Sequence, residues 1–236
     1  MQTALTALGD VRDGAEDIDR RGAIELDEMT CRLGPTEARV GPISAHIHRG
    51  ELVMVTGSQS GRHLEVVLRV LHGDRPIGGG QARVAGCNLR HIRSYTVGRL
   101  HRLVGYVEGL DGRLTPADVL GEKLCRLDAD PAGAGWTFRR QKAAVAALGA
   151  VGLSARLKMT IAGLPEVERR LVGIAAAIVQ GPSILLVNDP TSGLDGVDTR
   201  TVVRVLRRLQ AEDLTVVVGT WDPRLLRPHR GQVLEL

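Results

Sequence analysis

The segment from Ile184 to Asp195 constrains the fold more than any other part of the sequence. It starts with four apolar residues and becomes polar at Asn188 and Asp189. A short apolar run of this kind is typical of a strand that is buried on both faces, as in a parallel sheet covered by helices. Ligands of open α/β sheets bind at the carboxyl ends of the strands, so we expect Asn188 and Asp189 at a binding edge.

The composition agrees with a helix-covered sheet and excludes several other classes of protein. The chain has 236 residues, of which 43% are hydrophobic but only 2% are aromatic. Its core must therefore consist mainly of aliphatic side chains. No apolar run approaches the ~18 residues of a membrane span, and the N-terminus lacks a charged-then-apolar signal pattern. We therefore expect a globular, cytoplasmic protein.

The cysteines and the net charge identify no ligand. Cys31, Cys87 and Cys125 are odd in number and widely spaced, which argues against a disulfide framework and against a zinc site. The sequence predicts no metal site. A net charge of +4 permits contact with anionic lipids, nucleic acid or an acidic partner. Because aromatic residues are scarce, nucleic-acid binding by base stacking is not expected.

Residues 51–73 read as a strand, a polar glycine-rich loop and a helix. This order is typical of a phosphate-binding loop, which should read G-x-x-x-x-G-K-[ST]. The sequence here is Gly57-Ser58-Gln59-Ser60-Gly61-Arg62-His63-Leu64-Glu65. When the loop is aligned from the strand, His63 replaces the lysine and Leu64 replaces the hydroxyl residue. When it is aligned from the helix, Leu64 replaces the lysine and Glu65 replaces the hydroxyl residue.

Both alignments lack the lysine and the hydroxyl, which leaves Arg62 as the fixed cation of the loop. Each charge-assisted contact is worth about 1.5–3 kcal/mol. Losing two or three of them would move a micromolar nucleotide site towards millimolar affinity. Two interpretations remain open: a loop kept for its fold, or an unusual nucleotide site that uses Arg62 and backbone amides.

In order and spacing, these motifs resemble those of ABC transporter ATP-binding subunits. In that family the strand over Ile184–Val187 carries the Walker B motif, and the D-loop follows it, here Thr191-Ser192-Gly193-Leu194-Asp195. The length and the segment at Leu114-Thr115 resemble the lipoprotein-release, cell-division and macrolide-export types. The resemblance covers roughly residues 23–236.

The resemblance implies an α/β fold with three parts. A RecA-like P-loop NTPase core with an antiparallel β subdomain is expected at residues 23–109 and about 161–236. A helical subdomain is expected as an insertion at about 110–160, so that residues 23–236 form a single ABC-type cassette. Residues 1–22 show no strand alternation or clear apolar stripe, and they are interpreted as a flexible N-terminal extension.

The same resemblance identifies positions where this chain departs from the family pattern. Asn188 replaces the magnesium-binding aspartate, and Asp189 replaces the glutamate that activates water. Gly109 stands at the Q-loop glutamine and Trp221 at the switch histidine. Leu33 stands at the aromatic residue that stacks on adenine; it could cover one face of a purine, or it could be ordinary apolar packing.

The signature motif of the family, Leu-Ser-Gly-Gly-Gln, aligns with Leu164-Pro165-Glu166-Val167-Glu168. Pro165 removes a backbone donor, the two glutamates add negative charge, and the glycines that allow close approach are missing. A proline and acidic residues remain suitable for a helix start. The segment is therefore expected to keep its structure without binding phosphate.

Changes at all these positions predict a degenerate cassette, a pseudo-ATPase with a structural or regulatory role in an ABC transporter. Such a subunit would lie at the cytoplasmic face of the membrane against a transmembrane permease. It would pair with itself or a second cassette through Ser192, Gly193, Leu194 and Asp195, although this turn could also serve only as a helix entry. No nucleic acid is expected as a partner.

Two other functions remain open. A slow ATPase would use Asp189 as its base and Arg62 on the phosphates, whereas a soluble regulator would act without a permease. Mg-ATP is the only cofactor that the resemblance suggests, with low affinity if it binds at all.

Overall fold

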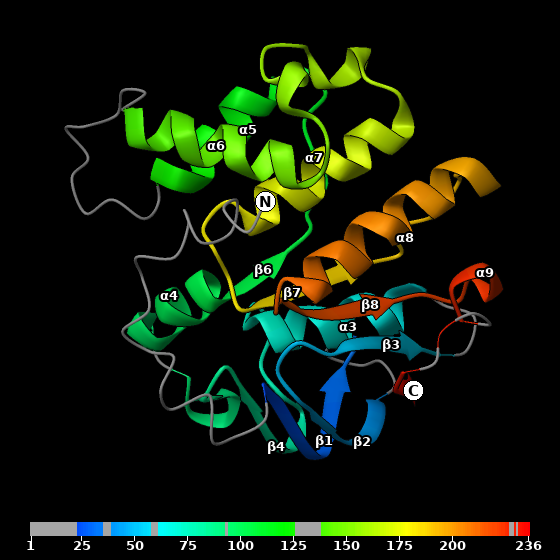
Figure 1. Cartoon of the computed structure of the whole chain (residues 1–236). Helices are drawn as coiled ribbons and strands as arrows, with labels where there is room; N and C mark the ends of the chain where they lie inside the picture. Colours follow the sequence, from blue (N-terminus) through cyan, green and yellow to red (C-terminus); the bar gives the residue numbers. More distant parts are fainter. Residues whose placement is uncertain are drawn as a thin grey trace.

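Two β-sheets and the helices around them make up the described part of the chain (Figure 1). In this computed structural model the described residues are 23–34, 39–57, 61–92, 94–125, 138–226, 229 and 231–236. Residues 1–22, expected to be a flexible extension, lie outside this part. Ser58, Gln59 and Ser60 of the phosphate loop lie outside it as well.

The larger sheet is parallel and has the strand order β6-β7-β8-β3-β9. Its strands are β6 (Val104–Tyr106), β7 (Ile184–Asn188), β8 (Thr215–Gly219), β3 (Leu52–Thr56) and β9 (Val233–Glu235). The four apolar residues of β7 are at most 1% exposed. This confirms the strand buried on both faces that the apolar run predicts.

The smaller sheet is antiparallel and has the order β2-β1-β4-β5. Its strands are β1 (Ile24–Arg32), β2 (Arg39–Ile47), β4 (Gly79–Val84) and β5 (Cys87–Asn88). The apolar residues Ile24, Leu26, Met29 and Cys31 of β1 are buried, whereas Asp27 and Glu28 between them are exposed. The antiparallel β subdomain expected near the start of the cassette is thus present.

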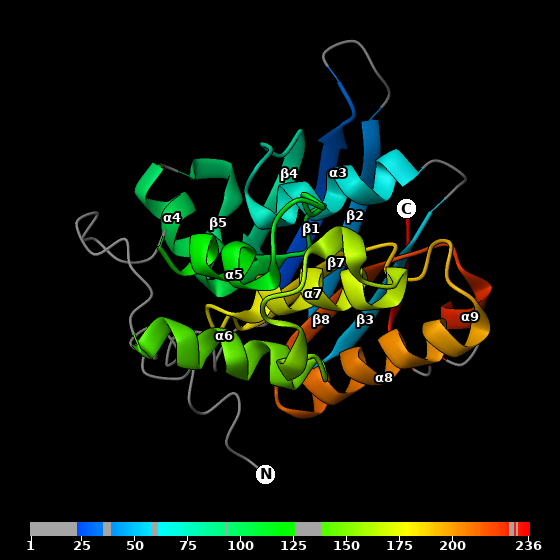
Figure 2. The same ribbon diagram turned by 90° about the horizontal axis from the view of Figure 1, so that it is seen from above.

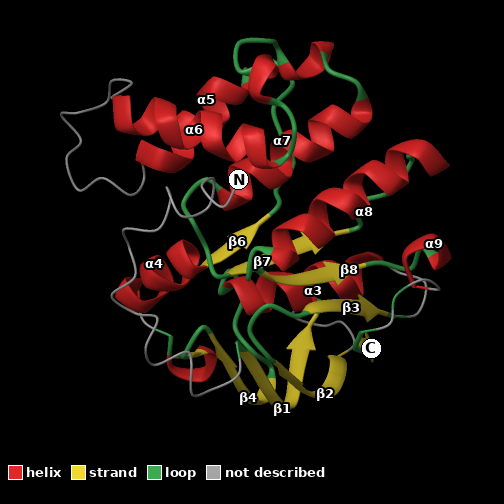
Figure 3. Cartoon of the chain, in the orientation of Figure 1, coloured by secondary structure: helices red, strands yellow, loops and turns green. Residues whose placement is uncertain are grey.

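Figures 2 and 3 show how the helices cover the two faces of the parallel sheet. The helices are α3 (Gly61–His72), α4 (Ser94–Leu103), α5 (Pro116–Cys125), α6 (Phe138–Ala150), α7 (Glu166–Ile178), α8 (Gly196–Ala211) and α9 (Pro223–Leu226), with short 3-10 turns at Leu89–His91, Ser154–Arg156 and Ile161–Gly163. Helices α5 and α6 fall in the range expected for the helical subdomain. The limits of that subdomain remain a prediction.

The parallel sheet separates two hydrophobic cores. Leu185 and Val187 of β7 face the core shared with α5 to α8, whereas Ile184 and Leu186 face the core shared with α3, α4 and the antiparallel sheet. This division follows from the alternation of side chains along a strand, which sends neighbouring residues to opposite faces. None of the helices in the described ranges is long and apolar enough to cross a membrane.

Candidate functional site

The helix after the phosphate loop places an apolar residue where the loop needs a polar one. Helix α3 begins at Gly61, and Leu64 in its first turn is only 1% exposed because it packs in the core under the antiparallel sheet. Leu64 replaces the lysine in one alignment and the hydroxyl residue in the other. In neither position does it present a polar group to a phosphate. His63 is half-buried and Arg62 is exposed.

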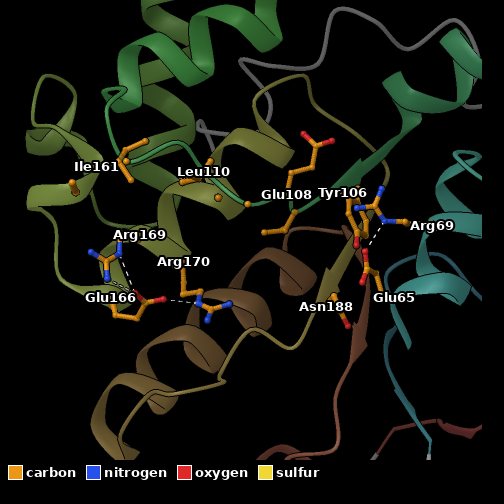
Figure 4. A pocket seen from close by; sticks show the side chains of 15 residues that line it. Glu65, Arg69, Tyr106, Glu108, Leu110, Ile161, Glu166, Arg169, Arg170 and Asn188 are labelled. Atoms are coloured by element: carbon orange, nitrogen blue, oxygen red, sulfur yellow. Dashed lines mark hydrogen bonds and ion pairs between the residues drawn. The ribbon is translucent and has the colours of Figure 1, made fainter. Parts of the chain in front are cut away.

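A cavity of about 590 Å³ lies between α3, β6, β7 and the start of α7 (Figure 4). The polar and small residues that line it include Glu65, Arg69, Tyr106, Glu108, Gly109, Glu166, Arg169, Arg170 and Asn188. Figure 4 shows Glu65 and Arg69 on one side and the Glu166 cluster on the other. The cavity brings together three of the predicted positions, Gly109, Glu166 and Asn188.

Other predicted site residues lie away from this cavity lining. Leu33 is half-buried and packs against the core of the antiparallel sheet, which agrees with ordinary apolar packing. Trp221 is 48% exposed. Leu164 is buried in the core with α7, and Val167 packs partly against it.

Arginines in the cavity lining are paired with carboxylates of the same lining. Arg69 Nε lies 2.8 Å from Glu65 Oε1, and Arg170 Nε lies 3.0 Å from Glu166 Oε1. Arg169 also donates to Glu166, and this bond is the main reason why the pKa of Glu166 lies below its usual value. A phosphate entering here would meet arginines whose positive charge is already balanced by carboxylates.

Glu108, another carboxylate of the lining, is also paired with a basic side chain. Lys123 Nζ lies 2.5 Å from Glu108 Oε2. Among the described residues, three glutamates and three arginines line the cavity, and their formal charges cancel before Lys123 is counted. A site for the multiply charged phosphates of a nucleotide needs an excess of positive charge or backbone donors.

The polar residues at the end of β7 offer little to a magnesium ion. Asn188 Oδ1 is buried and has no hydrogen-bond partner among the described residues, so one neutral oxygen is available there. Magnesium sites normally use one or two carboxylates. The Glu65 carboxylate on α3 is held by Arg69. The described residues of this cavity thus do not fit Mg-ATP.

Asp189 has an unusual backbone and a perturbed carboxyl group. Its φ is 44°, and its backbone N–H donates to Gly219 O at 2.7 Å. Burial raises the pKa of the Asp189 carboxyl, although a hydrogen bond with Ser192 opposes this effect. The carboxylate that a slow ATPase would use as its base is thus partly desolvated.

The signature segment is a helix start held by ion pairs. Pro165 precedes α7 and makes no side-chain cap. Glu168 Oε2 lies 3.0 Å from Arg156 Nε, and Arg169 donates to Leu164 O at 3.2 Å. Glu166 and Glu168 thus add negative charge to this segment, as the sequence predicts, but Arg170 and Arg156 neutralise it.

Sequence reasoning did not identify Arg69, Arg169 and Arg170 as part of the site. A signal was available, because Glu65–Arg69 and Glu166–Arg170 are oppositely charged pairs spaced i,i+4 on helices, and such pairs are neighbours on a helix surface. That the two pairs line one cavity depends on the placement of α3 and α7 in space.

The switch segment is tied to the D-loop by hydrogen bonds. Thr191 Oγ1 donates to Asp222 Oδ2 at 2.9 Å. Arg224 donates to Asp222 Oδ1 at 3.0 Å and to Leu194 O at 2.9 Å. The bond from Arg224 is the main cause that holds the pKa of Asp222 below its ordinary value. Asp222, the residue after Trp221, thus takes part in hydrogen bonds that connect the switch segment to the D-loop.

Asp195, expected at the dimer contact, is the N-cap of α8. Its Oδ1 accepts hydrogen bonds from the backbone N–H groups of Val197 and Asp198, both at 2.8 Å. Ser192 and Gly193 are exposed, whereas Leu194 is 6% exposed. The turn therefore has a role as a helix entry, and its role in a dimer stays a prediction.

Comparison with known proteins decides the family. The phosphonates import ATP-binding protein PhnC of Nocardia farcinica is 34% identical over 209 residues, which cover 86% of this chain and 77% of the relative. The chain belongs to the family of ABC transporter ATP-binding proteins. No family model matches this cassette.

Other relatives include the types that the sequence resembles. The cell division ATP-binding protein FtsE of Streptococcus pneumoniae is 26% identical, over 90% of this cassette and 91% of the relative. The macrolide export ATP-binding/permease protein MacB of Photorhabdus laumondii is 29% identical over 78% of this cassette. The match spans only 28% of the length of MacB.

Solved structures confirm the expected fold. A nucleotide-free ATP-binding cassette from an ABC transporter matches with a TM-score of 0.77 and 13% identity, over 91% of this cassette and 87% of that chain. A dimeric cassette in a post-hydrolysis state with ADP and Pi matches with a TM-score of 0.74 and 20% identity, over 90% and 94%. The fold is therefore that of an ABC cassette.

The hydrogen bonds at Asp222 predict a pH-dependent loss of stability in Asp222→Asn. The variant should be less stable by about 0.5–1 kcal/mol at neutral pH, a figure that allows for solvent screening of Arg224. Because the folded pKa of Asp222 is lowered, its contribution is present above the ordinary aspartate pKa of about 3.9 and is lost as the pH falls through the folded value. Urea unfolding of both proteins at neutral and acidic pH measures the difference.

The control uses Arg224→Ala as a second background. In that background Asp222→Asn should lower the free energy of unfolding much less, because the main partner of the carboxylate is already missing. A cost that is the same in both backgrounds, or that does not shrink in acid, contradicts the assignment.

Proposed function

We propose that this cassette is a pseudo-ATPase, a subunit with a structural or regulatory role in an ABC transporter complex. The observation that carries the proposal is the charge balance of the cavity, where Arg69, Arg169 and Arg170 are paired with carboxylates of the same lining. Burial of Leu64 supports it, because this residue replaces a polar group of the phosphate loop in either alignment. The phosphates of a nucleotide would compete with these carboxylates for the arginines, and the phosphate loop has no lysine that could bind the phosphates instead.

A slow ATPase is the second candidate, and Asp189 is the observation that favours it. A carboxylate whose pKa is raised by burial is better suited to accept a proton near neutral pH than an ordinary aspartate. Arg62, which is exposed at the start of α3, would then contact the phosphates. The proposed pseudo-ATPase and this alternative differ in two measurable properties.

The first property is affinity. We expect Mg-ATP to bind the purified full chain more weakly than about 0.1–1 mM, since two or three charge-assisted contacts of about 1.5–3 kcal/mol each are missing. Isothermal titration calorimetry with Mg-ATP measures this constant. Arg62→Ala should leave it within about twofold. A low-micromolar dissociation constant that Arg62→Ala abolishes would refute the pseudo-ATPase and support the second candidate.

The second property is hydrolysis. Asp189 is one methylene shorter than the glutamate of the family, which would place its carboxylate about 1 Å farther from the attacking water. A misplacement of this size can cost about 100-fold in rate. Phosphate release by the wild type should equal that of Asp189→Asn at saturating Mg-ATP. A clear decrease in the variant would show that Asp189 acts as a base in a working enzyme.

The proposal includes two kinds of partner: a transmembrane permease at the inner face of the membrane, and either a second copy or another cassette. The dimeric state of a solved cassette with this fold supports the second. The exposed start of α8 supports it as well, because Val197 beside the D-loop is 61% exposed. A substitution at Val197 therefore changes the surface beside the D-loop without disturbing the core.

A deletion strain complemented with variants tests these partners. Arg62→Ala with Asp189→Asn should restore the phenotype, because the chemistry is not needed. Val197→Glu should fail to restore it, since it adds a charge to the presumed contact while an acid remains compatible with a helix N-terminus. This substitution also leaves the cap at Asp195 intact.

The matched control is Ala211→Arg, an exposed position at the far end of α8. It should restore the phenotype, as a basic residue is favourable at a helix C-terminus. Failure of the Arg62 and Asp189 double variant at normal expression would refute the pseudo-ATPase. Full rescue by Val197→Glu would refute the proposed contact.

A further inference from the structure

The far end of α3 contains a group of side chains that the nucleotide site does not use. His72, Asp74 and His101 place two ring nitrogens and a carboxylate within 4.8 Å of one another. His72 ends α3, Asp74 follows it, and His101 lies in the last turn of α4. We propose that these three residues bind a divalent transition-metal ion of the zinc type.

The backbone fixes the position of Asp74 relative to His72. Gly73 has a φ of 92°, its N–H donates to Val70 O at 3.0 Å, and the Asp74 N–H donates to Arg69 O at 3.0 Å. This is the Schellman arrangement that ends many helices, and it requires a left-handed residue that glycine adopts without strain. The chain therefore turns back and brings the Asp74 carboxylate over the end of the helix.

Close packing of α4 against the end of α3 brings the third ligand near the other two. A Cβ atom on Gly73 would lie 2.7 Å from Leu100 Cδ2, so α4 contacts the end of α3 directly. Leu100 is fully buried, and His101 next to it faces the cluster. His72 and His101 stack with ring centroids 4.2 Å apart.

The distances suit ligands that share one ion. His72 Nδ1 lies 2.9 Å from Asp74 Oδ2, and His101 Nε2 lies 3.3 Å from Asp74 Oδ1. Both nitrogens are buried, and both have the single Asp74 carboxylate as their ion-pair partner. Buried polar atoms normally have a hydrogen-bond partner, and His72 as a whole is only 9% exposed. A cation between the nitrogens and the carboxylate would satisfy all three groups.

The donor set indicates the class of metal. Imidazole suits zinc, copper, nickel and iron, whereas magnesium and calcium prefer oxygen ligands. Two histidines and one carboxylate with further positions open to water are typical of catalytic zinc sites and non-haem iron sites. Coordination requires one ring to leave the stack, because a nitrogen lone pair lies in its ring plane and the two planes are inclined by only 5°. His101 can turn, as its side chain is 38% exposed.

An ion at this position would join the end of the phosphate-loop helix to α4. Tyr106 connects the cluster to the cavity, because its ring lies 5.5 Å from the His72 ring and 5.8 Å from the Arg69 guanidinium. Glu65, Arg69 and His72 follow one face of α3 at i, i+4 and i+7 spacing. The ion would therefore stabilise the helix that carries the nucleotide-facing residues.

The experiment titrates the metal-free full chain with ZnCl₂, and separately with CoCl₂, by isothermal titration calorimetry. We expect saturable binding of one ion per chain. His101→Ala and Asp74→Asn should each weaken it by at least about 100-fold, since loss of an outer partner alone costs about 10–100-fold. Zinc should also raise the urea midpoint of the wild type, but not of His101→Ala.

The matched control removes the other neighbouring histidine pair. His46 lies on β2 and His48 directly follows this strand. Their ring centroids are 4.6 Å apart, and both residues are exposed. The double variant His46→Ala, His48→Ala should bind zinc like the wild type. Absence of saturable binding in the wild type overturns the proposal. So does binding that survives both His101→Ala and Asp74→Asn with a native circular dichroism spectrum, or binding that the control variant abolishes.

Discussion

Burial of β7 on both faces is the constraint on which the rest of the structure depends. Its apolar residues divide between the two cores, with Leu185 and Val187 on one side and Ile184 and Leu186 on the other. A strand of this kind is stable only if helices cover both faces of its sheet. Because β6 and β8 pair with it in parallel, their carboxyl ends and those of β7 meet at one edge. The polar residues after these strands are thereby brought together.

At that edge, the described arginines of the cavity are paired with carboxylates. The family resemblance predicts a site rich in positive charge and backbone donors, whereas the described cavity contains arginines already bound to Glu65 and Glu166. Each carboxylate satisfies a guanidinium that would otherwise be costly to desolvate. An anion that enters the cavity would therefore compete with these carboxylates for the same arginines.

Helix α3 connects this cavity with the histidine cluster at its other end. Its first turn contributes Leu64 to the core, one face contributes Glu65 and Arg69 to the cavity, and its last residue is His72. A rigid helix transmits a constraint from one end to the other over its length. The proposed metal site at His72, Asp74 and His101 and the cavity therefore share one helix.

The sequence by itself determined the order of the elements, the buried strand, the antiparallel sheet near the start and the altered motif residues. These follow from local spacing: apolar runs, alternation, glycines and the replacements at Leu64 and Asn188. The tertiary structure alone decided that the charged pairs of α3 and α7 line one cavity, that Asp195 caps a helix, and that His72, Asp74 and His101 converge. The reason is physical. Secondary structure depends on residues a few positions apart, whereas a site depends on the packing of α3, α4 and α7 against one sheet, which brings distant residues within hydrogen-bond distance.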